Sequence, residues 1–211
     1  MEETKKKVRQ KDDYLVWFDT EYSGLELETA HLLQVAVMIT DKSLCRILPA
    51  ETDVRLAIQL PKEAIISPWV EENLSDLVTI CCSTQAVTLE EADLLLARHI
   101  DTIAGPPDEH EARRPILAGN SVHADWWLSK KYLPLFSQRL HYRHLDVTAL
   151  KLEWQNRFPG REFNKEDPAM IRQYFPEAHL DAGETRHDAY YDIQASIAEL
   201  AFYRRHFLQY V

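Results

Sequence analysis

Five side chains that could carry metal-assisted chemistry are spread along the sequence, and the first two are Asp19 and Glu21. They directly follow the apolar run 14–18, which predicts a buried strand. Residues two apart on an extended chain point to the same side of a sheet, so the two carboxylates are expected to lie together. Two like charges at the end of a buried strand are costly unless a cation lies between them. The simpler interpretation is a solvated turn whose acids cap the strand, and the other three residues bear on that choice.

Two more acids and a histidine follow at positions where they could join this pair. Asp125 is predicted in the helix after a short strand at 115–119, four residues from Ser121 and on the same helix face. Asp192 is predicted in the last helix, and His187 in the loop before that helix, where it can lean over the site. Ligand groups in α/β sheets gather at the carboxyl ends of strands, so the four acids are expected to converge there.

The ligand chemistry of this set favours a hard cation. Four carboxylates without cysteine suit Mg²⁺ or Mn²⁺ better than zinc. An imidazole can act as a proton acceptor, so His187 could take a proton from an attacking water. A histidine just before a helix is more often a cap or a packing residue, so its role depends on the acids lying beside it.

The elements that must position these residues form one α/β domain. Residues 32–40 predict a central strand, and 44–48 with 54–60 predict one interrupted strand or two short ones, so the chain opens with an antiparallel meander. The adjacent Cys81 and Cys82 are expected in a strand, one facing inward. Asn120 and Ser121 are expected to cap the helix that carries Asp125. Other predicted elements are a short helical turn at 61–66, helices at 68–77, 89–103, about 147–157 and 188 to about 209, and a short extended piece at 144–147.

Composition bounds the partners and the compartment. The 211 residues are 45% hydrophobic and 27% charged, which is ordinary for one globular domain. The net charge of −10 argues against a surface for long duplex nucleic acid, although bound divalent cations could hold a short anionic substrate. The three cysteines indicate neither a disulfide framework nor a zinc site, and the sequence predicts no membrane span. Residues 1–13 predict a flexible leader that is neither a signal nor a transit peptide, so a reducing cytoplasm is the default location.

Four motifs carry a family resemblance. They are 17–25 (WFDTEYSGL), 119–125 (GNSVHAD), 142–148 (YRHLDVT) and 187–193 (HDAYYDI). Together they resemble the oligoribonuclease family, the DEDDh branch of 3′-to-5′ exonucleases, over residues 14 to 207. The resemblance implies an RNase H-like mixed sheet, an antiparallel meander plus parallel strands flanked by helices, within a single domain at 14–211.

The resemblance also implies roles for individual residues. Four acids would hold two metal ions, His187 would be the general base, two apolar side chains would bracket bases, and polar side chains would contact the terminal phosphate. Tyr142 would reach the site of the neighbouring subunit, because these enzymes are typically homodimers, and Asp146 would be structural. The acids are Asp19, Glu21, Asp125 and Asp192, the base-bracketing residues are Leu25 and Trp69, and the phosphate contacts are Ser121, Arg143 and Thr148.

The expected activity is therefore metal-dependent release of nucleoside 5′-monophosphates from short single-stranded RNA, down to dinucleotides. The chain departs from the family pattern in three places: Ala149 replaces a second hydroxyl, Asn73 and Leu74 stand where a histidine is expected, and 158–183 looks like an insertion. Two alternatives remain open. One is a DEDDh exonuclease acting on DNA 3′ ends, and the other is an inactive nuclease-like domain that serves as an RNA-binding scaffold.

Overall fold

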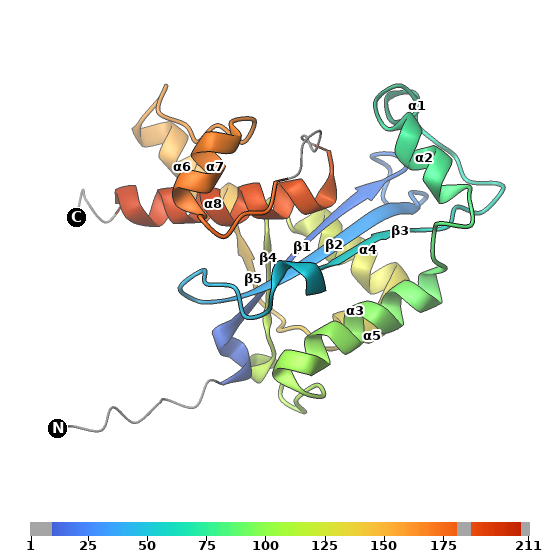
Figure 1. Cartoon of the computed structure of the whole chain (residues 1–211), viewed down its shortest axis with the longest axis horizontal. Coiled ribbons are helices and arrows are strands. Elements are labelled where there is room, and N and C mark those ends of the chain that lie inside the picture. The colour runs from blue at the N-terminus through green and yellow to red at the C-terminus, as the bar shows by residue number, and fades with distance from the viewer. Residues whose placement is uncertain (1–9, 181–186, 208–211) are drawn as a thin grey trace.

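A five-stranded mixed sheet forms the centre of the molecule in the computed structural model, which describes residues 10–180 and 187–207 (Figure 1). Most of the predicted leader, residues 181–183 of the expected insertion and Gln209 at the end of the predicted last helix lie outside the described residues. The strand order is β3-β2-β1-β4-β5. The strands are β1 (Tyr14–Tyr22), β2 (Leu32–Asp41), β3 (Val54–Ala57), β4 (Ile116–Gly119) and β5 (His144–Asp146).

The predicted meander and the predicted parallel strands are both present. β1 pairs antiparallel with β2, which pairs antiparallel with β3, whereas β4 lies parallel to β1 and β5 parallel to β4. β1 is thus central, with an antiparallel neighbour on one side and a parallel neighbour on the other. Its register places Asp19 opposite Ala36 and Glu21 opposite Gln34, and an irregularity follows between Glu21 and Tyr22.

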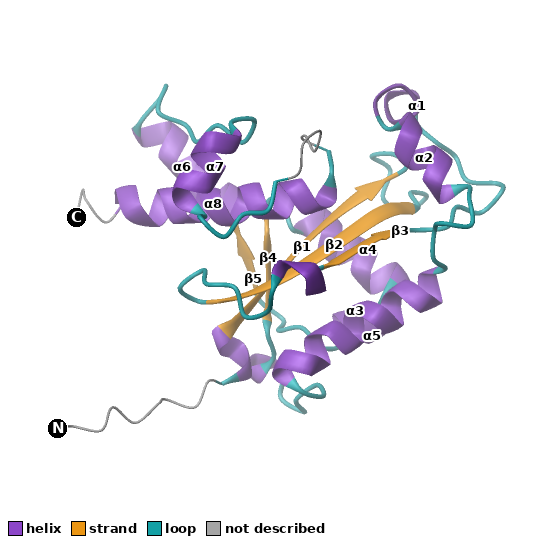
Figure 2. Cartoon of the chain, in the orientation of Figure 1, coloured by secondary structure: helices purple, strands orange, loops and turns teal. Residues whose placement is uncertain are grey.

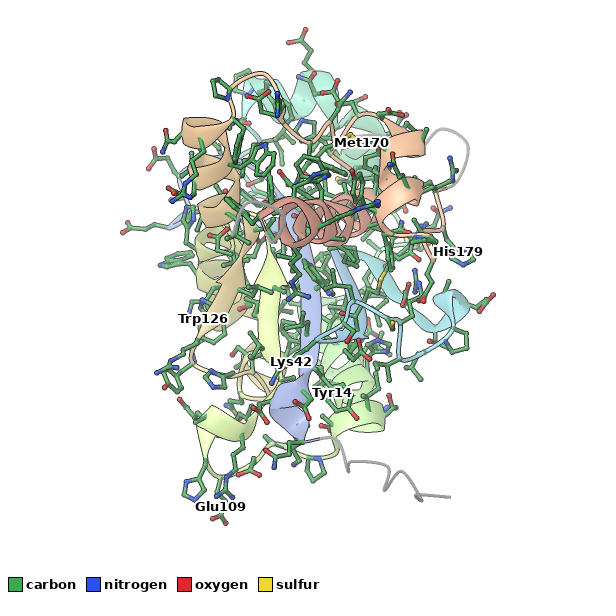
Figure 3. All side chains as sticks on the ribbon, turned by 90° about the vertical axis from the view of Figure 1, so that its left-hand side faces the viewer. Tyr14, Lys42, Glu109, Trp126, Met170 and His179 are labelled. Atoms are coloured by element: carbon green, nitrogen blue, oxygen red, sulfur yellow. The ribbon has the colours of Figure 1, made fainter. Side chains whose placement is uncertain are left out.

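Helices cover both faces of this sheet (Figure 2). The long C-terminal helix crosses one face with two shorter helices beside it, and Figure 3 views this helix nearly end-on above the strands. The other face is covered by three helices from the middle of the chain, which span 89–104, 123–132 and 134–137. The helices are α1 (Pro68–Asn73), α2 (Ser75–Cys81), α3 (Leu89–Ala104), α4 (His123–Tyr132), α5 (Pro134–Ser137), α6 (Val147–Arg157), α7 (Pro168–Tyr174) and α8 (Ala189–Phe207).

The alternation of side chains along β1 builds a separate core on each face. Leu15 and Trp17 pack with α8 and the residues that surround it, whereas Val16 and Phe18 pack against α3, α4 and α5. All four side chains are almost completely buried. A strand buried on both faces explains why the sequence here is continuously apolar rather than alternating.

Local sequence signals set the ends of several helices. Thr88 and Glu91 form a reciprocal capping box at the start of α3, and Gly105, at φ 69°, ends that helix. Ser67 caps α1, with Pro68 at its first position. Asp146 accepts a hydrogen bond from the Thr148 backbone N–H and so caps α6, which is a structural role, as expected.

The prediction of a strand at 44–48 is wrong. It makes a single bridge, between Thr40 and Arg46, and no strand forms there. Acidic side chains take the place of strand partners here. The Arg46 backbone N–H donates to the Glu177 carboxylate, and the Arg46 guanidinium pairs with the Asp53 carboxylate at 2.6 Å. The second run ends as a strand at Ala57, earlier than the predicted residue 60.

The region from 61 to 82 also differs from prediction. Residues 61–66 contain a turn and no helix, and the predicted helix at 68–77 is two short helices, α1 and α2. Cys81 ends α2 and Cys82 is its C-cap, so neither lies in a strand. The β-branched residues before them follow tertiary packing rather than propensity, because α2 buries Cys81 against Leu33 of β2. The expectation that one cysteine faces inward is confirmed.

The segment from 158 to 180 belongs to the core on the α8 face. Phe163, Ile171 and Phe175 are buried there beside α8. Its status as an insertion relative to the family stays a prediction. Within the described residues, every helix is too short or too polar to cross a lipid bilayer.

Candidate active site

Three carboxylates meet where β1 approaches the start of α8. Asp19 and Glu21 continue the row of Leu15 and Trp17, so they face α8, as the two-residue spacing predicted. Asp192 lies in the first turn of that helix. One oxygen from each of these three acids lies within 4.8 Å of the others, a grouping that could hold a metal ion.

Asp125 reaches the same place from the opposite face of the sheet. Thr20, which points away from α8, donates its hydroxyl to Asp125 Oδ1 at 2.7 Å. Asp125 is 5% exposed and lines the same cleft as the other three acids. The cleft has a volume of about 850 Å³. All four predicted acids are thus brought together.

The electrostatics of this cluster favour a bound cation. Burial, followed by the charges of Asp125, Asp192 and Glu21, raises the pKa of Asp19 well above its usual range, and Lys165 acts in the opposite direction. Burial and the neighbouring acids raise the pKa of Glu21 to about 8. Four carboxylates in one cleft cannot all ionise without positive charge, and bound divalent cations reverse that penalty. The donor set therefore fits divalent metal ions with oxygen ligands.

His187 lies in the loop before α8, as predicted, and lines the cleft. Its backbone adopts φ 71°, and its N–H donates to Asp192 Oδ2 at 3.0 Å. Its ring meets the ring of Trp69 edge-on, with 4.9 Å between centroids. The imidazole is thereby held against an aromatic wall beside the acids.

The predicted base-bracketing residues, Leu25 and Trp69, both line the cleft. Leu25 is 88% exposed and Trp69 46% exposed, so each presents apolar surface to solvent at the mouth of the site. Trp69 follows the capped start of α1, and Leu25 lies in the turn after β1. Exposed apolar side chains of this kind can stack on or wedge beside bases irrespective of sequence.

Ser121 lines the cleft, but not as the predicted helix cap. α4 begins at His123 with Val122 as its N-cap residue, and no side chain caps it. Ser121 has φ 52°, and its N–H is held by Asp146 Oδ1 at 3.0 Å and Thr148 Oγ1 at 2.9 Å. Because Ser121 precedes the helix, it does not share a helix face with Asp125. Thr148 touches Ser121 without itself lining the cleft.

Tyr142 and Arg143 lie outside the lining of the cleft of their own chain. Both are exposed just before β5, at the edge of the sheet, and the guanidinium of Arg143 lies 5.2 Å from the Tyr142 ring centroid. The structure of a single chain therefore does not bring these two predicted residues to the acids.

Several residues that shape the site are not apparent from the sequence. Gln34 receives the Ala189 N–H on Oε1 and donates Nε2 to Asp188, fastening the start of α8 to the strand beside Glu21. In the sequence, Gln34 is distinguished only as the one polar side chain in the apolar run 32–39. Gly119 is required by close approach, because an added Cβ would lie 3.0 Å from the Phe18 carbonyl oxygen.

Comparison with known proteins confirms the resemblance read from the motifs. The exonuclease family model matches residues 16–200. The oligoribonuclease of Francisella tularensis subsp. holarctica (strain OSU18) is 31% identical over 202 residues, covering 94% of this chain and 98% of the relative. The mitochondrial oligoribonuclease of Bos taurus is 32% identical over 195 residues, covering 90% of this chain and 71% of the relative.

The fold is also shared with solved structures. Exonuclease I from Methylocaldum szegediense superimposes with a TM-score of 0.60 at 16% identity, over 92% of this chain and 40% of that one. At this identity the likeness concerns the fold alone, and it agrees with the predicted RNase H-like mixed sheet. The chain therefore belongs to the exonuclease family and, like the oligoribonucleases that it matches over nearly its full length, is a 3′-to-5′ exoribonuclease.

Proposed function

We propose that this enzyme degrades short single-stranded oligoribonucleotides, down to dinucleotides, to nucleoside 5′-monophosphates. The observation that carries the proposal is the convergence of four carboxylates and His187 in one cleft with exposed apolar side chains at its mouth. A volume of about 850 Å³ lies within the roughly 300–1,000 Å³ of sites for small ligands. Such a cleft suits a nucleotide or two, whereas the net charge of −10 disfavours a long nucleic-acid track.

Two Mg²⁺ or Mn²⁺ ions are the proposed cofactors, held by Asp19, Glu21, Asp125 and Asp192. When bound, a pair of such ions neutralises the phosphoryl oxygens and orients the attacking water and the leaving 3′ oxygen for in-line displacement. The acids supply this site from both faces of β1, with Thr20 fixing the rotamer of Asp125. Oxygens of Asp19, Glu21 and Asp192 lie within 4.8 Å of one another and would hold one ion, and Asp125, which lines the same cleft, would contribute to the second.

His187 is the proposed general base. Its ring lies against the ring of Trp69, and its backbone N–H donates to the Asp192 carboxylate. These two contacts place the imidazole next to one of the four acids. From this position it can accept the proton of the attacking water as the new phosphorus–oxygen bond forms, while the ribose 3′ oxygen leaves.

The remaining predicted residues are proposed to hold the substrate. Leu25 and Trp69 bracket bases, and Ser121, which lines the cleft, contacts the terminal phosphate. Thr148 and Arg143 lie outside the lining of the cleft and are proposed to reach a phosphate that extends beyond it, for which the donor fork of arginine is suited. Tyr142 acts in the site of a second subunit of a homodimer. Its exposure on the sheet edge, next to Arg143 and away from its own cleft, supports contact across an interface.

The proposed location is the cytoplasm. All three cysteines are free thiols in the structure, a state that a reducing compartment maintains.

Hydrolysis of a 5′-labelled diribonucleotide with Mg²⁺ or Mn²⁺ tests the substrate. We expect release of mononucleotide, loss of that release in Asp19→Asn, and none of that loss in Asp101→Asn. Asp101 pairs with Arg139 on the far face of the sheet, so it is a matched acid-to-amide control. Faster cleavage of the matching deoxyribonucleotide would favour the alternative of a DNA 3′-end exonuclease. Absence of any cleavage by the folded, metal-loaded protein would favour the scaffold alternative.

A further inference from the structure

A fifth acid, Glu199, lies behind the cleft in α8 and is 0% exposed. Its Oε1 accepts the Tyr203 hydroxyl at 2.7 Å, and its Oε2 accepts Asn120 Nδ2 at 3.0 Å. Lys165 Nζ lies 3.4 Å from the same Oε2. A buried carboxylate is tolerated only when donors and counter-charge surround it, and here three donors do so.

Asn120 links this acid to the arm of the site that carries Asp125. It lies between β4 and α4, and both hydrogens of its amide are used, one by Glu199 and one by Ser196 Oγ at 2.9 Å. Its Oδ1 accepts the Thr148 hydroxyl at 3.3 Å. The turn leading into α4 is therefore fastened to α8 through a side chain with no spare donor.

Ser196 and Lys165 link the same acid to the arm that carries Asp192. Ser196 donates its hydroxyl to the Asp192 carbonyl at 2.7 Å. Lys165 Nζ reaches Ser196 Oγ at 3.4 Å, while its own carbonyl accepts the hydroxyl of Tyr191, the neighbour of Asp192, at 2.7 Å. Lys165 comes from the segment before α7, so three separate parts of the chain meet at Glu199.

We propose that Glu199 is a positioning residue for the nuclease reaction, which through Asn120, Ser196 and Lys165 fixes the distance between the Asp125 arm and the Asp192 helix. Because the two arms supply ligands from opposite faces of β1, their spacing sets the geometry of the metal pair. This inference rests on the proposed function, since it concerns the metal site of that same cleft.

Glu199→Gln tests it with almost no change of volume. The amide keeps one acceptor for Tyr203 or for Asn120 but turns a donor toward the other, and it removes the partner charge of Lys165. We expect kcat on a diribonucleotide to fall about 10- to 100-fold with little change in KM, and Mn²⁺ affinity, measured without RNA by the loss of the free-ion paramagnetic resonance signal, to weaken by a similar factor.

Asp93→Asn is the matched control. Asp93 is also a buried acid, in α3 on the other face of the sheet, where it accepts the N–H groups of Leu135 and Phe136. It should lose stability in urea as Glu199→Gln does, but keep the wild-type kcat and Mn²⁺ affinity. Equal stability losses with wild-type kcat and Mn²⁺ affinity in both variants would overturn the proposal.

A second variant keeps the test decisive if Glu199→Gln fails to fold. Asn120→Ala removes the link from the partly exposed end, and it should weaken Mn²⁺ binding in the absence of RNA; unchanged binding would overturn the proposal. If the wild-type protein binds Mn²⁺ but leaves RNA intact, the proposed substrate is wrong, whereas the role of Glu199 is still judged by the metal affinities.

Discussion

Replacing Glu21 with glutamine should stabilise the metal-free protein. Glu21 is buried beside Asp19 and Asp192, and the structure gives it a pKa of about 8 in place of 4.5. Burial is the largest cause and the neighbouring acids come next. Glutamine keeps the shape of the side chain while removing the charge that burial and the other carboxylates oppose.

The sign and size follow from proton linkage. Between pH 4.5 and about 8 the folded protein keeps a proton on Glu21 that the unfolded chain has lost, so the free energy of unfolding falls as pH rises. The contribution of this residue is complete below pH 4.5 and lost by about pH 8. The difference corresponds to roughly 5 kcal/mol at 25 °C, or on the order of 10 °C in Tm for a chain of this size. Asp19, whose pKa is also raised, acts in the same direction.

Urea unfolding in EDTA at several values between pH 5 and 8.5 measures this effect. The wild-type protein should lose stability steadily over that range, whereas Glu21→Gln should show a flatter profile and be the more stable of the two at pH 8. With saturating Mn²⁺ the order should reverse, because metal binding displaces protons and stabilises only a folded chain whose acids are intact.

Glu28→Gln is the control, because Glu28 is exposed in the turn before β2 and should leave the profile unchanged. If Glu21→Gln in EDTA has the same pH profile as the wild-type protein, then Glu21 does not carry the cost of ionisation, and the electrostatic case for a metal pair in this cleft is refuted.

Three further predictions concern activity. His187→Asn should lower the single-turnover rate constant about 10²- to 10⁴-fold while Mn²⁺ affinity stays near wild type. Asparagine tolerates the positive φ and keeps the backbone N–H that donates to Asp192, so a large loss of Mn²⁺ affinity would contradict the role of base. Trp69→Ala should raise KM for a diribonucleotide by roughly 5- to 100-fold, the range of one lost base stack, with a smaller effect on kcat, and an unchanged KM would remove Trp69 from base binding. Mixing inactive Asp19→Asn with Tyr142→Ala should restore activity in a steady-state assay if Tyr142 acts across a dimer, since one site of the mixed dimer is then intact; no recovery in mixed dimers would place Tyr142 outside the partner's site.

The sequence predicted those parts of the site that depend on local periodicity. Asp19 and Glu21 share a face because strand alternation is regular, and His187 precedes α8 because the helical pattern begins after it. Ser121 was misplaced because Asp146 and Thr148, from a later part of the chain, hold its backbone in a left-handed conformation. Contacts across such separations leave no local signal.

The supporting residues were missed for a related reason. Lys165 lies in a proline-rich segment without clear periodicity, and Glu199 stands among apolar residues of α8, where a buried acid looks like a break in the pattern. The role of Lys165 and Glu199 becomes apparent only when the fold brings them into contact. In the same way, Cys81 and Cys82 were expected in a strand, whereas packing against β2 accompanies a helix that ends at Cys81.

The two-sided role of β1 ties catalysis to correct folding. A slip of one residue against β2 would turn Trp17 toward α3 and Phe18 toward α8, and it would carry Asp19 and Glu21 away from Asp192 at the same time. A molecule with the wrong strand register would therefore be inert toward RNA rather than a nuclease of altered selectivity. Such coupling means that a misregistered copy has neither a normal core nor an assembled set of metal ligands.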